Sequence, residues 1–400
     1  MRVTMLNKYY PPHLGGIEFH MRDLSEALAR RPDTHVRAIV ANEGGRRVTE
    51  TLNGVEVVRL PRRANAASTP IAPSMRAAIR SEAAASPAER PDVFHLHFPY
   101  PWGEVSWLAA GGGGTAKGST AAAAAHVPAV VTYHSDIVRQ KAGLAAYRPL
   151  LERFLDRVDL IIASSPNMVD HSAFLNPRAE KCRVVPFGIN VDEFAATPER
   201  ARRAAELRRG YTRPIILFVG RLIYYKGADV LVKAIRDVDA DLVIIGTGPL
   251  ESELRAIAAD ADMLDRVTFL GSQPFGELVA WYHAADLFCL PSVARSEAFG
   301  LVQIEAHAAG TPVVSTTLTT GVPFANEDGV TGFTVPPSDV DALANALRTL
   351  VDDRDLRERF GRQALERARR DFTIDRMVDD TLEVYAEAAE IRARADGAAA

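Results

Sequence analysis

Two glutamates eight positions apart, Glu297 and Glu305, could form a catalytic pair. They lie in RSEAFGLVQIEAHAAG, at the two ends of a segment that becomes apolar at Phe299. Eight helical residues rise about 12 Å, whereas the carboxyl groups of glycosidases lie about 5 to 9.5 Å apart. The spacing therefore disfavours a glycosidase acid/base pair. It favours two separate hydroxyl-recognition roles along an extended ligand.

The surrounding sequence predicts the elements that position these glutamates. LFCLPS is typical of a strand, residues 293–296 of a loop, and residues 299–309 of a helix that stops at Gly310. Glu297 would then lie at the helix entrance, where simple capping is the alternative to a site role. Glu305 would lie about two turns into the helix, where an exposed helix face is the alternative.

Two cations follow another apolar strand in FVGRLIYYKG. Arg221 offers a planar fork of donors and Lys226 a point charge, a combination that suits a diphosphate. A solvated charge pair is the alternative. Ligands of open α/β sheets bind at the carboxyl ends of strands, so this position favours anion binding.

The N-terminal half offers two weaker candidates. Gly15 and Gly16 in PPHLGGIEFH begin a helix after the first strand, where backbone N–H groups can approach a phosphate or sugar, although a tight turn is the alternative. His134 follows a strand in VVTYHSDIV and could hydrogen-bond a sugar or accept a proton. A structural histidine is the competing interpretation of His134.

The sequence identifies no metal site. His95 and His97 alternate in FHLHF and so share one face of a strand, but a site would need a third ligand that the sequence does not nominate. The acidic residues from 237 to 241 precede the strand LVIIG, at its amino end, and those at 339 and 341 are predicted to cap a helix. We therefore expect no metal cofactor.

Composition excludes several classes of protein. With 47% hydrophobic residues, 24% charged residues and a net charge of -4, the chain is typical of soluble globular proteins and gives no reason to expect nucleic-acid binding. Cys182 and Cys289 have no metal-type spacing and are predicted to be buried free thiols of a reducing compartment. No signal peptide or apolar run of about 20 residues is found, so we expect a cytoplasmic protein. Peripheral contact with the inner membrane face is the alternative to a fully cytoplasmic location.

Strand and helix patterns alternate in two successive series, which predicts an α/β fold with two doubly wound domains. The expected strands are residues 3–6, 35–41, 55–60, 92–98, 129–134 and 160–165, and then 214–220, 242–246, 267–271, 287–292 and 311–316. Residues 190–214 are charge-rich and predict a connector with one exposed helix. The last helix is expected over 375–394.

Residues 109–125 are rich in Gly and Ala and are predicted to form a flexible loop. Gly113 and Gly118 have the spacing of a phosphate-binding loop, but Ser119 stands where its lysine belongs. A nucleotide-binding role for this stretch is therefore not expected.

Taken in order over residues 1–390, a set of motifs resembles glycosyltransferase family 4, the retaining nucleotide-sugar transferases with the GT-B fold. The motifs are GGIEFH, TYHSD, VPFGIN, GRLIYYKG, IGTGP and SEAFGLVQIEAHAAGTPVV. The segments VVTYHSDIV, VVPFGIN and TTGVPFANEDGVTGF together are especially similar to bacterial mannosyl- or rhamnosyl-type members that build cell-surface glycans.

The resemblance implies two Rossmann-like domains that face a central cleft. Residues 1–190 would bind the acceptor, residues 191–374 would bind the nucleotide sugar, and the helix in 375–400 would cross back to the first domain. Residues 109–125 depart from the family pattern and would lengthen a surface loop of the acceptor domain.

The resemblance also implies roles for the donor-site residues in the second half. Glu297 would contact sugar hydroxyls and Glu305 the nucleotide ribose, while Arg221 and Lys226 would bind the diphosphate. Backbone N–H groups at the start of the next helix would meet the sugar and diphosphate. These belong to Phe299, Gly300 and Leu301.

Three further residues are implied for the same site. Gly246 of IGTGP would bind the donor, and Gly16, beside Gly15, would lie near the phosphate. His134 would lie close to the transferred sugar.

The implied reaction is transfer of a hexosyl unit, with retention, from a nucleoside diphosphate sugar to a glycan or lipid-linked acceptor. GDP-mannose is the first donor to expect and UDP-hexoses follow. The rival functions are a nucleotide-sugar epimerase of the same architecture and a non-catalytic nucleotide-sugar-binding protein. An oxidoreductase is disfavoured because Glu251 occupies the third glycine position of a dinucleotide fingerprint.

Overall fold

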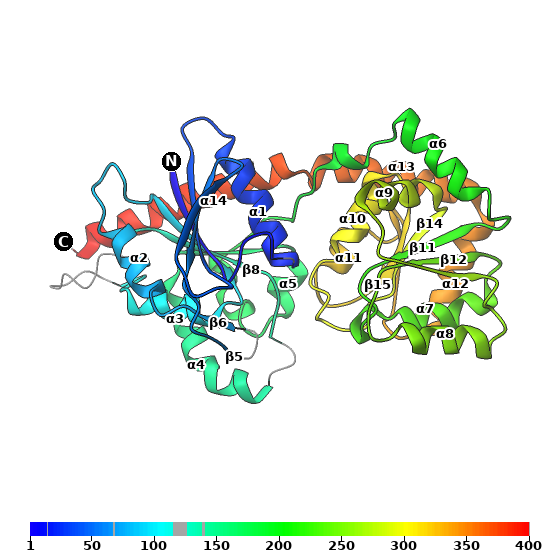
Figure 1. The fold of residues 1–400 in the computed structure, drawn as a ribbon, viewed down its shortest axis with the longest axis horizontal. Coiled ribbons are helices and arrows are strands. Elements are labelled where there is room, and N and C mark those ends of the chain that lie inside the picture. The colour runs from blue at the N-terminus through cyan, green and yellow to red at the C-terminus, as the bar shows by residue number, and fades with distance from the viewer. Residues whose placement is uncertain (14, 67–68, 115–125, 138–140, 400) are drawn as a thin grey trace. The chain divides into compact units, whose positions relative to one another are not determined.

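The computed structural model describes residues 1–13, 15–66, 69–114, 126–137 and 141–399. The chain forms two compact units (Figure 1). Unit 1 comprises Met1–Ser164, Val169–Phe187 and Ile374–Ala400, and unit 2 comprises Ser165–Met168 and Gly188–Thr373. The chain thus passes from unit 1 to unit 2 after Phe187 and returns at Ile374, and the short segment Ser165–Met168 is also grouped with unit 2.

Unit 1 is built on an eight-stranded sheet in the order β10-β9-β8-β7-β1-β2-β4-β3. All pairs are parallel except β3 with β4. Its strands are β1 Arg2–Leu6, β2 His35–Ala41, β3 Val48–Leu52, β4 Val55–Leu60, β7 Val93–Phe98, β8 Ala129–Tyr133, β9 Leu160–Ala163 and β10 Cys182–Val184, with a separate hairpin of β5 Ala64–Ala66 and β6 Thr69–Ile71. The helices of this part are α1 Gly16–Ala29, α2 Met75–Ala83, α3 Pro101–Ala109, α4 Lys141–Arg157, α5 Pro166–His171 and α14 Ile374–Ala399.

Unit 2 is built on a six-stranded, all-parallel sheet in the order β13-β12-β11-β14-β15-β16. Its strands are β11 Ile215–Val219, β12 Asp241–Ile245, β13 Val267–Gly271, β14 Leu287–Leu290, β15 Val313–Thr316 and β16 Gly332–Val335. Its helices are α6 Pro198–Arg208, α7 Ala228–Ala234, α8 Glu251–Asp260, α9 Phe275–Ala284, α10 Leu301–Ala308, α11 Val322–Ala325, α12 Val340–Asp352 and α13 Arg354–Asp371. The helix α6 is the exposed helix predicted for the connector.

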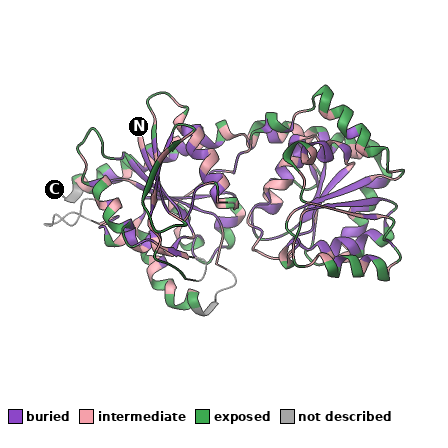
Figure 2. Ribbon diagram, in the orientation of Figure 1, coloured by how far each residue is buried: buried purple, intermediate pink, exposed green. Residues whose placement is uncertain are grey.

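The central strands are buried on both faces, as parallel strands covered by helices must be (Figure 2). Unit 1 has a core that joins β1, β2 and β7 to α1 and α14. In unit 2, one core lies under α7, α8 and α12, and another under α9 and α10. Unbroken runs such as IILFV and DLVII form these buried strands.

The last helix, α14, packs in unit 1. Met377, Val378 and Tyr385 are buried in the core of that unit, and α14 contacts α1, β8 and β9. The helix continues to Ala399, so the prediction that it ends near residue 394 is wrong.

The Gly-rich stretch is more tightly packed than a flexible loop where the structure describes it. A Cβ on Gly112 would lie 2.2 Å from the Trp107 ring, and one on Gly113 would lie 2.3 Å from the carbonyl oxygen of Arg157. The prediction of a loose linker is therefore wrong for residues 110–114. Residues 115–125, with the remainder of the false phosphate-loop motif, lie outside the described residues.

Two predictions from composition can be examined directly. Both cysteines are free, as predicted, but only Cys289 is buried, whereas Cys182 is partly exposed. None of the helices in the described part of the chain is both long and apolar enough to cross a bilayer.

Candidate functional site

The predicted cations and glutamates of unit 2 lie on loops that follow neighbouring strands. Lys226 follows β11 and Glu297 follows β14. These strands pair directly, although β12 lies on the other side of β11. This is the point where strand order reverses, and ligands of open α/β sheets bind there.

Lys226 and Glu297 form a buried ion pair. The Lys226 Nζ lies 2.6 Å from Glu297 Oε2, and both residues are less than one-tenth exposed. The Ser292 hydroxyl donates to the same carboxylate oxygen at 3.0 Å. The pair therefore holds both charges in place at the end of the sheet, where one partner alone would carry a large desolvation cost.

Backbone contacts hold the two loops together. The amide of Val293 donates to the Tyr225 carbonyl at 2.8 Å. Gly227, which follows Lys226, has a φ of +66°, and a Cβ there would lie 2.0 Å from the Pro291 carbonyl oxygen. Glycine is thus required for the close approach that brings Lys226 to Glu297.

Arg221 differs from Lys226 in being exposed. Its guanidinium donates a long hydrogen bond of 3.4 Å to the Tyr225 hydroxyl, and no carboxylate among the described residues pairs with it. Its charge is consequently available to an anion in solution.

The helix α10 begins at Leu301, two residues later than predicted, because Gly300 adopts the left-handed conformation with a φ of +75°. A Cβ on Gly300 would lie 2.4 Å from Leu290 Cδ2. Gly300 caps the helix without a side chain, so capping by Glu297 is wrong. The first N–H groups of the helix lack intrahelical acceptors, and the helix dipole favours negative charge there.

Glu305 is partly buried, so a solvated helix face is also wrong for it. Its Oε2 accepts a hydrogen bond from the Tyr282 hydroxyl at 2.7 Å. Burial raises the pKa of Glu305, while the hydrogen bond from Tyr282 and the nearby Lys226 act in the opposite direction.

Gly246 has a structural reason to be glycine. With a φ of +135°, a Cβ at this position would lie 1.9 Å from the Gly220 carbonyl oxygen. The amide of Gly220 donates to Ile245 at 2.9 Å, and that of Gly246 donates to Gly271 at 2.8 Å. Donor binding by Gly246 stays a prediction, because backbone packing already explains this residue.

Gly16 in unit 1 differs from Gly246, because protein packing does not explain why it is glycine. It begins α1, and apart from its chain neighbours and the backbone of its own helix, no atom of the described residues lies within 4 Å of the position that its Cβ would occupy. A Cβ on Gly15, by contrast, would lie 2.2 Å from the Glu18 carboxylate. Protein packing therefore does not require glycine at residue 16, and space for a ligand remains beside the helix start.

His134 directly follows β8 and is buried. Its Nε2 lies 3.0 Å from Nδ1 of His97. Burial, together with the nearby His20 and His95, lowers the pKa of His134 well below its usual range. At neutral pH the ring is uncharged, which favours a hydrogen-bonding role over a charged one.

His95 and His97 share a face of β7, as predicted, and their rings stack with centroids 4.6 Å apart. His95 is used structurally: its nitrogens contact the Tyr385 hydroxyl at 2.6 Å and the Thr132 hydroxyl at 2.7 Å. The sequence analysis missed His20, whose ring lies 4.9 Å from that of His134. Its position on the buried face of α1, beside Met21 and in register with Leu24, was an available signal.

The acidic residues set aside from metal binding take the structural positions expected. Asp239 and Asp241 pair with Arg213 at the amino end of β12. Asp339 accepts the Ala342 amide as the cap of α12.

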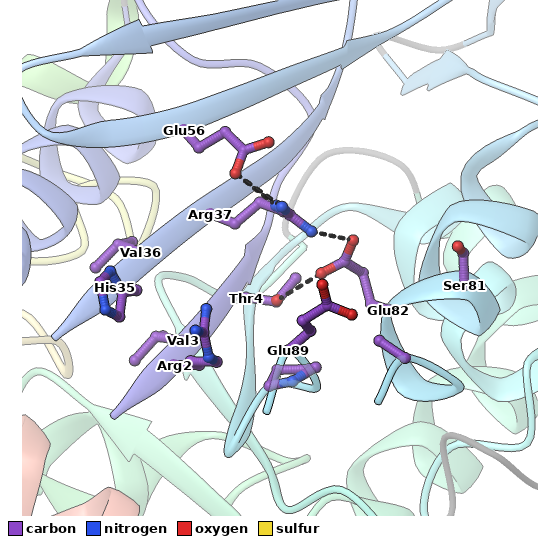
Figure 3. Close-up of a pocket in the computed structure, with 12 residues that line it drawn as sticks. Arg2, Val3, Thr4, His35, Val36, Arg37, Glu56, Ser81, Glu82 and Glu89 are labelled. Carbon is purple, nitrogen blue, oxygen red and sulfur yellow. Dashed lines mark hydrogen bonds and ion pairs between the residues drawn. The ribbon is translucent and has the colours of Figure 1, made fainter. Parts of the chain in front are cut away.

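A cavity of about 440 Å³ lies at the opposite end of the unit 1 sheet from His134 (Figure 3). It is lined by the first residues of β1, β2 and β4 and the end of α2. Arg37 lies there between Glu56 and Glu82, at 2.8 and 2.7 Å. Because the cavity is at the amino ends of strands, and because Arg37, one of the two arginines that line it, is already paired, it is not the candidate site.

Two protein families match consecutive parts of the chain. Residues 14–193 match Glycosyltransferase Family 4, and residues 200–367 match Glycosyl transferases group 1.

Similar proteins extend this match over the full chain. The chain is 33% identical over 396 residues to O-antigen chain mannosyltransferase C of Escherichia coli, covering 96% of this chain and 98% of the relative. It is 39% identical over 287 residues to D-rhamnosyltransferase WbpZ of Pseudomonas aeruginosa, covering 72% and 71% of the two chains.

Solved structures agree on the fold. HepE of Anabaena in complex with UDP has a TM-score of 0.76 at 19% identity, covering 96% of this chain and 100% of that one. Sucrose-phosphate synthase of Thermosynechococcus elongatus has a TM-score of 0.73 at 24% identity, covering 96% and 98%. The chain belongs to glycosyltransferase family 4 and is a hexosyltransferase with the GT-B fold.

Proposed function

We propose that the chain transfers a mannosyl unit, with retention of configuration, from GDP-mannose to a glycan or lipid-linked acceptor in cell-surface polysaccharide synthesis. The observation that carries the proposal is the exposed Arg221 together with the buried Lys226–Glu297 pair, all at the carboxyl ends of β11 and β14. The named mannosyl- and rhamnosyltransferase relatives support the sugar class.

Negative charge develops on the departing diphosphate as the glycosidic C–O bond breaks. Arg221 supplies a guanidinium fork to that charge, while Lys226 supplies a fixed ammonium group. The N-terminus of α10 adds backbone donors beside them. With these groups in place the transfer proceeds without a catalytic metal, so activity is expected to persist in the presence of EDTA.

Glu297 has a second carboxylate oxygen, beyond the one that Lys226 and Ser292 contact, with which to accept a hydrogen bond from a sugar hydroxyl. Glu305 is assigned to the nucleotide ribose. The departing phosphate oxygen takes the acceptor proton on the face of the leaving group, so that no protein nucleophile is needed. His134 acts as a neutral hydrogen-bond partner of the transferred sugar.

Arg221→Ala tests the diphosphate assignment, because the exposed side chain can be removed at little cost in stability. We expect turnover to fall by roughly 100-fold to 1,000-fold with an unchanged unfolding midpoint. Arg236→Ala is the matched control, since Arg236 is an exposed arginine at the amino end of the same sheet. Near-normal turnover of Arg221→Ala would exclude the assignment.

Donor and reaction type are tested separately by incubating the protein with GDP-mannose or UDP-hexoses, with and without lipid-linked glycan acceptors. Acceptor-dependent release of GDP and an α-linked product from the α-linked donor are expected. Conversion of the donor sugar without acceptor would identify an epimerase instead. Release of UDP without release of GDP would identify a UDP-hexose, instead of GDP-mannose, as the donor.

A further inference from the structure

Three histidines from separate elements of unit 1 converge in its interior. His20 comes from α1, His97 from β7, and His134 from the residue after β8. Each offers one ring nitrogen, and these three nitrogens all lie within 4.8 Å of one another. The residues are only 7%, 1% and 5% exposed.

Two ring nitrogens of this cluster lack hydrogen-bond partners. Nε2 of His20 and Nε2 of His97 are buried without a partner among the described residues. Leaving such a group unsatisfied is destabilising. The aromatic ring of Phe187 packs against His20 and His134, with centroids 4.5 and 5.4 Å away. Nε2 of His97 lies across its ring from Nδ1, the nitrogen that faces His134, so the unpartnered nitrogen that can contribute to binding is Nε2 of His20.

We infer that His20, His97 and His134 form a binding site for a divalent transition metal that prefers imidazole ligands, of which Zn²⁺ is the representative. Neutral imidazole is the commonest protein ligand of such ions. Two nitrogens bound to one tetrahedral zinc lie about 3.3 Å apart, and Nδ1 of His97 lies 3.0 Å from Nε2 of His134. An ion bound to these two nitrogens and to a ring nitrogen of His20 would replace the hydrogen bond between His97 and His134 and complete a three-histidine site.

This site differs from the metals that assist nucleotide chemistry. Mg²⁺ and Mn²⁺ prefer oxygen ligands, and the cluster consists of three imidazoles. His134 is also assigned to the transferred sugar under the proposed function, but metal binding is measured without any sugar substrate, so failure of one assignment is distinguishable from failure of the other.

The first experiment titrates metal-free, full-length protein with Co²⁺, followed by visible absorption, and with Zn²⁺ in competition with a chromophoric chelator. We expect one ion per chain with the absorption of tetrahedral Co²⁺. His20→Gln is expected to weaken binding by more than about tenfold. His35→Gln, which removes an exposed imidazole from β2, is the control and is expected to bind as the unmodified protein does.

Absence of one-to-one binding would overturn the inference, and so would equal weakening by His20→Gln and His35→Gln. X-ray absorption of the Zn²⁺ complex of the unmodified protein keeps the test independent of variant folding. Three imidazole ligands support the site, and fewer than three overturn it.

Discussion

Two buried glutamates, one in each unit, have different hydrogen-bond and ion-pair partners. Glu297 lies on a loop of unit 2 and meets an ammonium group at 2.6 Å and a hydroxyl at 3.0 Å. Glu104 lies on α3 of unit 1 and accepts one backbone hydrogen bond, from Tyr100 at 2.8 Å, while its other oxygen has no partner among the described residues. Burial raises the pKa of Glu104 to about 8.

The difference is that Glu297 has a cationic partner, whereas Glu104 has none and its charge is suppressed by burial. A buried carboxylate with a cation and a hydroxyl donor can stay ionised, whereas one without a cation takes up a proton. The compensated glutamate lies at the proposed donor site, and the uncompensated one lies on a helix that packs within unit 1. Compensation by a cation, more than burial, therefore distinguishes the candidate site residue.

The strongest test of this comparison removes the cation. Lys226→Ala leaves Glu297 buried without its partner, and we expect the free energy of unfolding of unit 2 to fall by about 3–5 kcal/mol. Transfer activity is expected to be lost. Denaturant unfolding and a transfer assay measure the two effects.

The double variant Lys226→Ala/Glu297→Ala separates stability from activity. It removes both charges, so most of the lost stability is expected to return while transfer stays absent. If the double variant were as unstable as the single one, the unpaired charge of Glu297 would not be the cause of the stability lost in Lys226→Ala. Lys233→Ala, which breaks an exposed pair with Asp229, is the matched control.

The second test addresses the suppressed charge. The folded-state pKa of Glu104 lies above its ordinary value of 4.5, so the folded protein binds the proton more tightly than the unfolded chain does. The resulting stability is present below pH 4.5 and is lost as the pH rises towards 8. We expect Glu104→Gln to remove this dependence and to stabilise unit 1 by on the order of 3 kcal/mol at pH 7.

Denaturant unfolding at several pH values measures this effect. Trp281→Phe provides the background, because it leaves Trp102 and Trp107, both in unit 1, as the fluorescent reporters. Equal pH slopes for Glu104→Gln and its background between pH 5 and 8 would contradict the prediction.

The smallest effect is expected at Glu305, which accepts a hydrogen bond from the Tyr282 hydroxyl and is influenced less by the charge of Lys226 than by that bond. Glu305→Gln keeps the size of the side chain but weakens the hydrogen bond that the side chain accepts from a ribose hydroxyl. We expect GDP affinity to fall about tenfold, or about 1.4 kcal/mol, with turnover at saturating donor little changed. Calorimetric titration with GDP measures this change, and a loss of turnover at unchanged affinity would contradict the ribose assignment.

The buried strands could be predicted from the sequence because continuous apolar runs identify them. The edge strand β3, VTETL, was missed because its residues are largely exposed and polar, and the edge strand β16 was missed in GFTV, which is too short to give a clear pattern. Local sequence carries little information on strands whose stability comes from a single neighbour.

The site residues were predicted from their positions after strands, but their partnerships were not. Lys226 and Glu297 are 71 residues apart, and Tyr282 and Glu305 meet only because α9 and α10 pack on the same sheet face. The position of His20 on the apolar face of its helix marks it as buried, but it was missed because nothing in the chain shows that this face packs beside His97 and His134. Contacts between residues so far apart in the chain cannot be predicted from the spacing of residues in the sequence.

The position of α14 in unit 1 has a consequence for biosynthesis. A ribosome delivers residues 374–399 after all of unit 2, yet Tyr385 completes the unit 1 core and contacts His95 of β7. Every residue of unit 2 has been synthesised before that contact can form. Unit 1 is therefore begun before unit 2 and completed after it, and a nascent chain must protect the uncovered β7–β9 face of its sheet until α14 has been synthesised.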